Sequence, residues 1–206
     1  MARVRRTAEE SRQRILEAAE ELLLDGGSAA VEVRAVAARI GMTDAGVKHH
    51  FGSRQGLQSA LLRRGGRRLR GAVADAVDRA TERDALDLRA VIGAIAEVYS
   101  EGYGELAIAL HAAGWRDDDA GLLDPLVQVL HQARLAVDPA ATLAATRRAV
   151  AACHLAIAVS PTYGEAFRRS ADLVDQAASA HEEMIEWWAS TLEVVLGLPG
   201  PSGPRG

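Results

Sequence analysis

The stretch from residue 34 to residue 57, RAVAARIGMTDAGVKHHFGSRQGL, constrains the fold of this chain more than any other. It predicts a short helix, a glycine turn, a second short helix and the start of a third. Gly41 stands where the first helix must end in a left-handed conformation, which glycine adopts without steric cost. Thr43 follows as the N-cap of the second helix. Because so short a helix is unstable alone, it must be held by packing through Val47 and Phe51.

The outer face of this second helix is predicted to carry small and polar residues. A short, rigid helix held away from its own core is what insertion into a DNA major groove requires. The sequence therefore predicts a helix-turn-helix that binds double-stranded DNA, with Arg34 as the candidate for a guanine edge. Upstream, Arg3, Arg5 and Arg6 form a basic arm that either tracks the backbone or enters the minor groove. The predicted DNA-binding residues are Arg34, Thr43, Asp44, Ala45, Gly46, Lys48, His49, His50 and Arg54.

A longer pattern surrounds this motif, and it resembles the DNA-binding domain of TetR/AcrR-type transcriptional regulators. The residues that carry the resemblance are Arg14, Ile15, Leu16, Ala18, Ala19, Gly26 or Gly27, Gly41, Met42, Thr43, His49, His50, Phe51, Ser53 and Leu57. It covers about the first 57 residues. The resemblance implies an all-helical homodimer whose helices at about 139–159 and 171–196 form a four-helix bundle with the partner.

The resemblance also implies a pocket among the middle helices, where a small effector binds and releases the operator. Pockets of this kind are mostly apolar with a few polar groups. The large residues with polar tips in those segments, and hence the candidate pocket residues, are Tyr99, Tyr103, His111, Trp115, His131 and His154.

The predicted DNA-binding domain departs from the family pattern at three places. Lys48 replaces a tyrosine that touches a phosphate, and its charge does not reproduce the same geometry. Glu32 and Val33 occupy positions where a serine or threonine caps a helix and binds phosphate. Asp44 either accepts a hydrogen bond from a cytosine or only favours the helix dipole. These departures concern the operator sequence rather than the mode of binding.

Composition and charge agree with a helical DNA-binding protein. Of 206 residues, 49% are apolar and only 4% aromatic, which favours closely packed helices over sheet. Residues 1–70 hold 14 Lys or Arg and 8 Asp or Glu, a net charge of +6, whereas the remainder holds 10 and 20, a net charge of −10. DNA binding is thus expected of the first part alone. We predict an all-α fold of about nine or ten helices, with a DNA-binding domain over 1–55, a ligand-binding and dimerisation domain over 56–198 and a disordered tail over 199–206.

Local start and stop signals place the individual helices. Thr7 and Glu10 have capping-box spacing, and Ser53 caps the helix that contains Gly65-Gly66, which is either a hinge or a tolerated weak point. The pair Asp138-Pro139 predicts an N-cap followed by an N1 proline, and Ser160-Pro161 predicts the end of that helix. The predicted ranges outside the helix-turn-helix are 8–25, 54–80, 84–100, 105–113, 122–137, 139–159 and 171–196. The last range carries an apolar stripe of Leu173, Val174, Ala177, His181, Met184, Ile185, Trp188, Leu192 and Val195.

Signals for other classes of protein are weak. Cys153 is the single cysteine, which excludes an intramolecular disulfide and leaves a core or redox role open. The acidic triplet 117–119 lacks a second acidic site, and the His181 motif has Ile185 where a second zinc ligand belongs. We therefore predict no metal, no cofactor and no enzymatic activity. The basic start lacks the apolar segment of a signal peptide, and the longest uncharged apolar stretch, 149–159, is too short to span a bilayer. A cytoplasmic protein without a membrane partner is expected.

These observations predict a ligand-responsive transcriptional regulator, most simply a repressor that an unknown small-molecule effector releases from a palindromic operator. One alternative is a helical-bundle enzyme or small-molecule-binding protein with a non-functional helix-turn-helix. A second is an interaction protein that has lost DNA binding, because of Glu32, Val33 and Lys48. Binding to the DNA that flanks its own gene separates the regulator from both.

Overall fold

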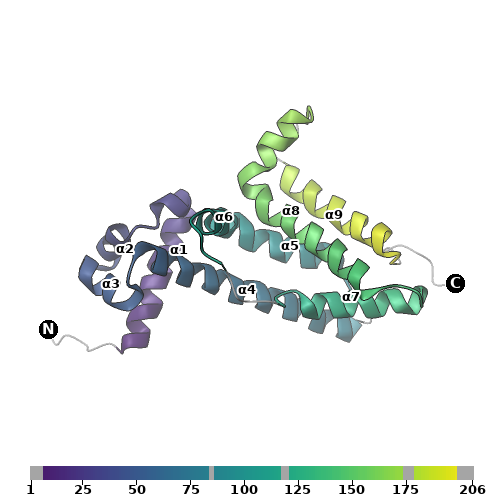
Figure 1. Cartoon of the computed structure of the whole chain (residues 1–206), viewed down its shortest axis with the longest axis horizontal. Coiled ribbons are helices and arrows are strands. Elements are labelled where there is room, and N and C mark those ends of the chain that lie inside the picture. The colour runs from purple at the N-terminus through teal and green to yellow at the C-terminus, as the bar shows by residue number, and fades with distance from the viewer. Residues whose placement is uncertain (1–6, 84–85, 117–120, 174–178, 199–206) are drawn as a thin grey trace. The chain divides into compact units, whose positions relative to one another are not determined.

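A computed structural model describes residues 7–83, 86–116, 121–173 and 179–198, and all regular structure in these ranges is helical (Figure 1). The all-α prediction is therefore confirmed for this part of the chain. Two compact units make up the fold: unit 1 comprises residues 1–66 and 101–116, and unit 2 comprises residues 67–100 and 117–206. The predicted domain boundary after residue 55 does not coincide with this division, and it stays a prediction about function.

Unit 1 contains the predicted helix-turn-helix. Its helices are α1 (Ala8–Ala30), α2 (Val33–Ile40), α3 (Asp44–Phe51), the first part of α4 (Arg54–Arg83) and α6 (Gly104–Ala112). The capping box predicted at α1 is confirmed, because the Thr7 hydroxyl accepts from the Glu10 amide and the Glu10 carboxylate accepts from the Thr7 amide. The predicted end of α1 is confirmed as a kink, where Gly26 and Gly27 leave helical geometry and Gly27 has φ +69°. A further short turn then completes α1.

Buried aliphatic side chains hold unit 1 together. The fully or almost fully buried ones are Ile15, Leu16, Ala19, Leu23, Val36, Ala37, Val47, Leu57 and Leu61. They come from α1 to α4 at three- to four-residue spacing, so each helix turns one apolar face inward. The prediction that Val47 anchors the short α3 is confirmed, since its side chain is 0% exposed.

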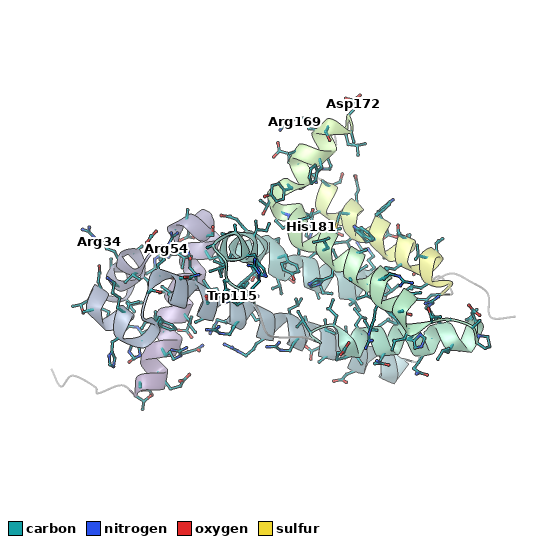
Figure 2. All side chains as sticks on the ribbon, viewed as in Figure 1. Arg34, Arg54, Trp115, Arg169, Asp172 and His181 are labelled. Carbon is teal, nitrogen blue, oxygen red and sulfur yellow. The ribbon has the colours of Figure 1, made fainter. Side chains whose placement is uncertain are left out.

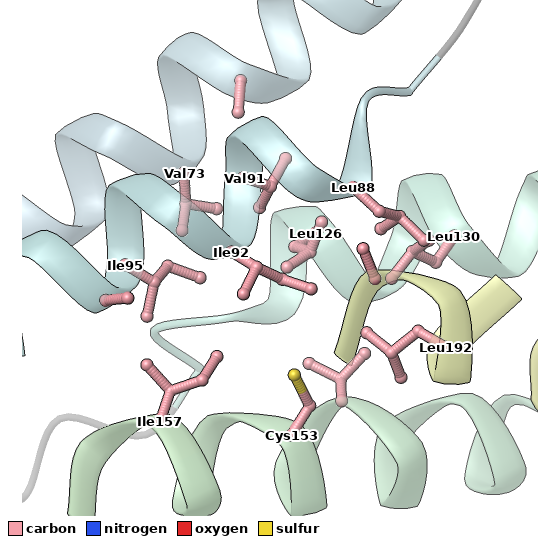
Figure 3. Close-up of a cluster of buried hydrophobic side chains, with 14 of the residues drawn as sticks. Val73, Leu88, Val91, Ile92, Ile95, Leu126, Leu130, Cys153, Ile157 and Leu192 are labelled. Carbon is pink, nitrogen blue, oxygen red and sulfur yellow. The ribbon is translucent and has the colours of Figure 1, made fainter. Parts of the chain in front are cut away.

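Unit 2 is a helical bundle around one apolar cluster. It contains the rest of α4, α5 (Leu88–Val98), α7 (Asp124–Val137), α8 (Leu143–Ser170) and α9 (Ala180–Leu196). Helix α5 packs against α9, α8 packs against α7 and α9, and aliphatic side chains from all these helices meet in the cluster (Figure 3). Cys153 lies inside this cluster, where burial raises the pKa of its thiol to about 12. A buried thiol held in its neutral form is a packing residue rather than a reactive one.

A π-helical segment, η1 (Tyr99–Tyr103), follows α5 directly. The predicted helix over 84–100 begins later than expected, because the side chain of Asp87 caps α5 by accepting from the Ala90 amide. Residues 84–85 lie outside the described part. Gly102 has φ +93° and lies against Leu23, so it breaks the helical path before α6, as the sequence predicted.

Helix α4 runs without interruption through Gly65-Gly66, which agrees with the prediction of a tolerated weak point in one long helix. The reason for the first glycine is steric. A Cβ on Gly65 would lie 2.4 Å from a ring carbon of Tyr103, whereas one on Gly66 would have no neighbour within 4 Å. Gly65 therefore allows a close approach of the buried tyrosine ring.

Both predicted ends of the helix over 139–159 are wrong. Asp138 forms a turn instead, in which its carboxylate accepts from the Ala140 amide, and Thr142 caps α8 by accepting from the Ala145 amide. Pro161 lies inside α8, which continues to Ser170. A proline removes one helical hydrogen bond but does not always end a helix.

The last helix begins at Ala180 rather than near residue 171. Leu173 is 47% exposed and outside any helix, so it does not belong to the apolar stripe. Within α9, Ile185 and Leu192 are buried as predicted, whereas His181 and Val195 are exposed in the single chain. Val174 and Ala177 of the predicted stripe, the acidic triplet 117–119, the arm 1–6 and the tail 199–206 lie outside the described residues.

Helix α8 is long and apolar enough to cross a membrane by length and composition alone, and only 22% of its most apolar stretch is buried. The predicted eleven-residue stretch is thus part of a longer helix. A single helix of this kind is weak evidence for a membrane span.

Candidate functional site

Local caps fix the ends of the two short helices of the helix-turn-helix. Gly41 has φ +64° at the end of α2, and its left-handed conformation turns the chain toward α3. Thr43 accepts from the Gly46 amide at 3.1 Å and so caps α3. Both roles were predicted from the sequence and are confirmed.

Arginines on α1 and α2 hold the helix-turn-helix in place. Arg12 donates to the carbonyl of His50 at 2.8 Å, and Arg14 donates to the carbonyl of Ile40 at 3.1 Å. Each arginine thus satisfies a free carbonyl at the end of a short helix. Arg12 also lies 4.4 Å from the centre of the Phe51 ring. Sequence reasoning missed these contacts, because nothing in the spacing of Arg12 reveals a partner 38 residues away.

A third arginine ties α2 to α1 from the side. Arg39 forms ion pairs with Glu21 at 3.2 Å and with Asp25 at 3.1 Å. The groups are about a third to two thirds exposed, so each pair contributes modestly. Together with the two arginines of α1, these contacts make α2 and α3 one rigid body with α1.

The predicted DNA-binding residues divide into two groups. The exposed ones on α3 and its cap are Thr43, Asp44, Ala45, Lys48 and His49. Arg34 is exposed on α2 and points away from the ribbon (Figure 2). Neither Arg34 nor Lys48 has a recorded ion pair within the described ranges. The structure thus presents these side chains to solvent from one rigid helix-turn-helix.

The second group is engaged within unit 1. Gly46 is half-buried, and a Cβ on it would lie 2.8 Å from the Met42 side chain. His50 is also half-buried, with its ring 5.5 Å from that of His49. Arg54 forms an ion pair with Glu32 at 2.9 Å. This pair places a positive charge beside the Glu32 carboxylate.

The joint between α1 and α2 is held by side chains from α4 and α6. Arg54 and Gln58 both donate to the carbonyls of Val31 and Ser28. The Glu105 carboxylate accepts from the Ser28 hydroxyl at 2.6 Å and from the Ser28 amide at 3.2 Å. These polar contacts fix the orientation of the helix-turn-helix relative to the rest of unit 1.

A second contact joins η1 to α1. The Tyr103 hydroxyl donates to Glu20 at 2.5 Å, and the other oxygen of Glu20 pairs with Arg64 at 3.0 Å. Tyr103 is 1% exposed. Its described contacts therefore give this predicted pocket residue a place in the packing of unit 1.

The remaining candidate pocket residues lie at separate places. Tyr99 and His154 meet in unit 2, with the hydroxyl oxygen 2.8 Å from Nε2 of the histidine. His131 contacts Thr146 at 3.4 Å elsewhere in that unit. In unit 1, His111 is exposed and its ring lies 5.3 Å from that of Trp115. The structure brings together Tyr99 with His154 within unit 2 and His111 with Trp115 within unit 1.

Burial sets the charge state of the Tyr99–His154 pair. It raises the pKa of Tyr99 to about 12 and lowers the pKa of His154 below its usual value. Both side chains are therefore neutral near pH 7. Among the described residues, no group of three or more His, Cys, Asp or Glu side chains is placed to hold a metal ion.

Comparison with known proteins identifies the first part of the chain. Residues 15–61 match the model of the family described as bacterial regulatory proteins, tetR family. No curated protein sequence matches the chain. Among solved structures, the crystal structure of superantigen PfiT is similar, with a TM-score of 0.55 and 17% identity over 96% of this chain and 100% of that one. At this identity the likeness concerns the fold alone.

Proposed function

We propose that this chain is a TetR-family DNA-binding transcriptional regulator, as the family match of residues 15–61 supports, and that it acts as a homodimeric repressor which a small-molecule effector releases from a palindromic operator. The observation that carries the proposal is the outer face of α3, which is exposed although the helix itself is held rigidly by α1 and by its own caps. A rigid, exposed helix of this length suits insertion into a major groove. We propose that the protein regulates transcription in the cytoplasm and does not act as an enzyme.

The exposed group of side chains supplies the proposed DNA contacts. Lys48 and His49 face outward from α3 and are proposed to contact a phosphate or a base edge. Arg34 extends from α2 and is proposed to read a guanine, which would be worth roughly 1–3 kcal/mol on the cognate site. Arg54 is proposed to act through its contacts with Glu32 and the α1–α2 joint, because its side chain is already engaged there.

Dimerisation is proposed through α8 and α9. These helices pack on each other, yet large apolar side chains remain exposed on both. Leu155 on α8 is 64% exposed, and Trp187 and Val194 on α9 are 60% and 80% exposed. Exposed apolar side chains of this size on adjoining helices mark an interaction surface, and two-fold pairing is the commonest solution. A two-fold dimer would present two copies of α3 to half-sites about 34 Å apart.

The proposed response to a ligand rests on the Tyr99–His154 pair. Tyr99 packs against the apolar cluster and pairs with His154, and a few polar groups in a mostly apolar setting are what small-molecule sites contain. If the effector weakens DNA binding, operator DNA must weaken effector binding by the same factor.

A gel-shift titration against duplexes from the DNA that flanks the gene tests the proposal. We expect specific binding at low salt that weakens steeply as salt is raised. The Lys48→Ala variant should bind less tightly, whereas Arg148→Ala, which removes an exposed positive charge from α8, should bind like the parent protein. Absence of specific binding would favour a helical protein whose helix-turn-helix no longer functions.

A further inference from the structure

The Tyr99–His154 pair leaves one buried polar atom without a partner. The Tyr99 hydroxyl lies 2.8 Å from Nε2 of His154, and the two rings meet edge to face at 5.4 Å. Nδ1 of the same histidine is buried and has no hydrogen-bond partner among the described residues. Buried polar atoms are nearly always paired, so an unpaired one calls for an explanation.

The chemistry of the two groups assigns the proton on the imidazole. A phenol is a stronger acid than a neutral imidazole N–H, and an imidazole nitrogen is a stronger base than a phenol oxygen. The Tyr99 hydroxyl therefore donates to Nε2, and the single ring proton of the neutral His154 resides on Nδ1. The unpaired atom is accordingly an N–H donor.

His111 on α6 shows how a helical histidine can satisfy this nitrogen within its own helix. Its Nδ1 lies 2.8 Å from the carbonyl of Ala107, four residues earlier in α6. Nδ1 of His154 makes no equivalent contact with its own helix, while its Nε2 is engaged by Tyr99.

The surroundings of Tyr99 are apolar. Tyr99 packs against the unit 2 cluster, which also contains Ile95 on α5 and Cys153 and Ile157 on α8. Among the described residues of this unit, the ion pairs of Arg89 with Glu182 and Glu186 and of Arg147 with Asp124 lie on exposed side chains. Low polarity strengthens a hydrogen bond to an uncharged group and penalises an ion that lacks a counter-charge.

We propose that the Nδ1–H of His154 donates a hydrogen bond to the carbonyl oxygen of an uncharged, mainly apolar ligand. This inference rests on the proposed function, since it names the chemical class of the effector. Tyr99 acts as a positioning residue that fixes the proton and the orientation of the ring. The lowered pKa of the histidine agrees with this assignment, because a neutral imidazole is required.

Two substitutions of His154 distinguish the roles of its two ring nitrogens. Glutamine places its amide nitrogen near the position of Nε2 and keeps a partner for Tyr99, but it removes the Nδ1–H. Asparagine places its amide nitrogen near Nδ1 and keeps a donor there. His181→Gln, on an exposed face of α9, is the matched control.

The probe is 2-heptanone, titrated into the full-length protein by calorimetry beside heptanoate. We expect saturable binding of the ketone and weaker binding of the carboxylate. His154→Gln should lower ketone affinity about three- to tenfold, the usual effect of one net hydrogen bond. His154→Asn should retain more of the affinity, and His181→Gln all of it. Equal ketone binding by the parent protein and His154→Gln, or no saturable binding, would overturn the proposal.

Nitrogen NMR of histidine-labelled protein gives a second test that does not depend on a variant remaining folded. In the free protein we expect the His154 resonances of a neutral ring protonated at Nδ1, and the Nδ1 proton should move downfield when the ketone binds. A ring protonated at Nε2 would overturn the assignment. The gel shift distinguishes the two proposals: operator binding without ketone binding rejects this site alone, whereas ketone binding without operator binding rejects the regulator alone.

Discussion

Lys48 and Arg54 are both exposed basic side chains of unit 1, but their surroundings differ. Lys48 faces solvent on α3, whereas Arg54 pairs with Glu32 and donates to the carbonyls of Val31 and Ser28. We expect Lys48→Ala to reduce the salt dependence of DNA binding by about one phosphate contact and to leave stability unchanged. Arg54→Ala should lower the free energy of unfolding by about 1 kcal/mol, because it leaves two carbonyls without a charged donor.

Urea denaturation and salt-dependent fluorescence anisotropy measure the two effects for both variants. The Arg54 ion pair is about half exposed, so the hydrogen bonds to the carbonyls account for most of the expected loss. If Arg54→Ala kept full stability and lost affinity as Lys48→Ala does, Arg54 would be a direct phosphate contact after all.

Gly65 and Gly66 are neighbours in α4 with opposite expected responses to alanine. A Cβ at Gly65 would collide with the buried ring of Tyr103, so Gly65→Ala should destabilise the protein by about 1–3 kcal/mol. Gly66 has free space, so Gly66→Ala should stabilise α4 by about 0.5–1 kcal/mol. Thermal denaturation of the two variants checks this pair, and equal responses would show that Tyr103 does not pack against Gly65 in solution.

His154 makes the free energy of unfolding depend on pH, and the direction of its pKa shift sets the direction of that dependence. Burial lowers its pKa in the folded protein, while the unfolded chain titrates near 6.5. As the pH falls below about 6.5, the unfolded state binds the proton first, so the free energy of unfolding decreases until the lower folded pKa is passed. Above about pH 6.5, His154 is neutral in both the folded and the unfolded state, so its contribution to the free energy of unfolding is constant. Denaturation between pH 7.5 and pH 5 should show a smaller loss in His154→Gln, and identical losses would refute a lowered pKa.

At the scale of the element, the start of α8 shows how one cap prevails over another. Asp138 and Thr142 both accept from backbone amides, but only Thr142 stands at the N-cap of the helix. Thr142→Ala should therefore reduce helix stability by about 1 kcal/mol. Thr142→Ser, which keeps the hydroxyl, should retain most of it. Hydrogen exchange at the Ala145 amide reports the change locally, and unchanged protection in Thr142→Ala would contradict the capping role.

The short helices of unit 1 were predictable from sequence because their ends depend on local chemistry. The signals at Thr7, Gly41, Thr43 and Ser53 act within three or four residues, and each is confirmed in the structure. The ends of α8 were not predictable, because Asp138-Pro139 and Thr142 compete and only packing decides between them. Pro161 is accommodated within α8, where the final ten residues are mostly exposed.

The candidate site was predictable only to the level of helix faces. Helical periodicity places Lys48 and His49 outward, as the structure has them. No local signal in the sequence indicated the contacts between distant residues. Three such contacts join Arg54 with Glu32, Glu105 with Ser28, and Tyr99 with His154, over 22, 77 and 55 positions respectively. Such pairs depend on tertiary packing, which a single sequence does not display.

At the scale of the whole molecule, the proposed dimer predicts that a charged residue placed on the exposed apolar face lowers the mass of the sedimenting species. Leu155→Glu and Val194→Glu each place a carboxylate on the α8–α9 face and should shift sedimentation from dimer to monomer at micromolar concentration, because a charge buried without a partner is strongly unfavourable. Val137→Glu is the matched control, since this residue is 62% exposed at the end of α7. A parent protein that sediments as a monomer, or a dimer unaffected by both substitutions, would rule out this interface.

Unit 1 is assembled from two stretches of the chain, residues 1–66 and residues 101–116, and this limits how the protein can be recombined. A graft that carried residues 1–66 alone onto another body would leave Ser28 without Glu105 and Gly65 without the ring of Tyr103. The DNA-reading part is therefore not a contiguous cassette. A working chimera must take both stretches from the same parent, so crossovers between positions 66 and 101 are expected to separate residues that have to be inherited together.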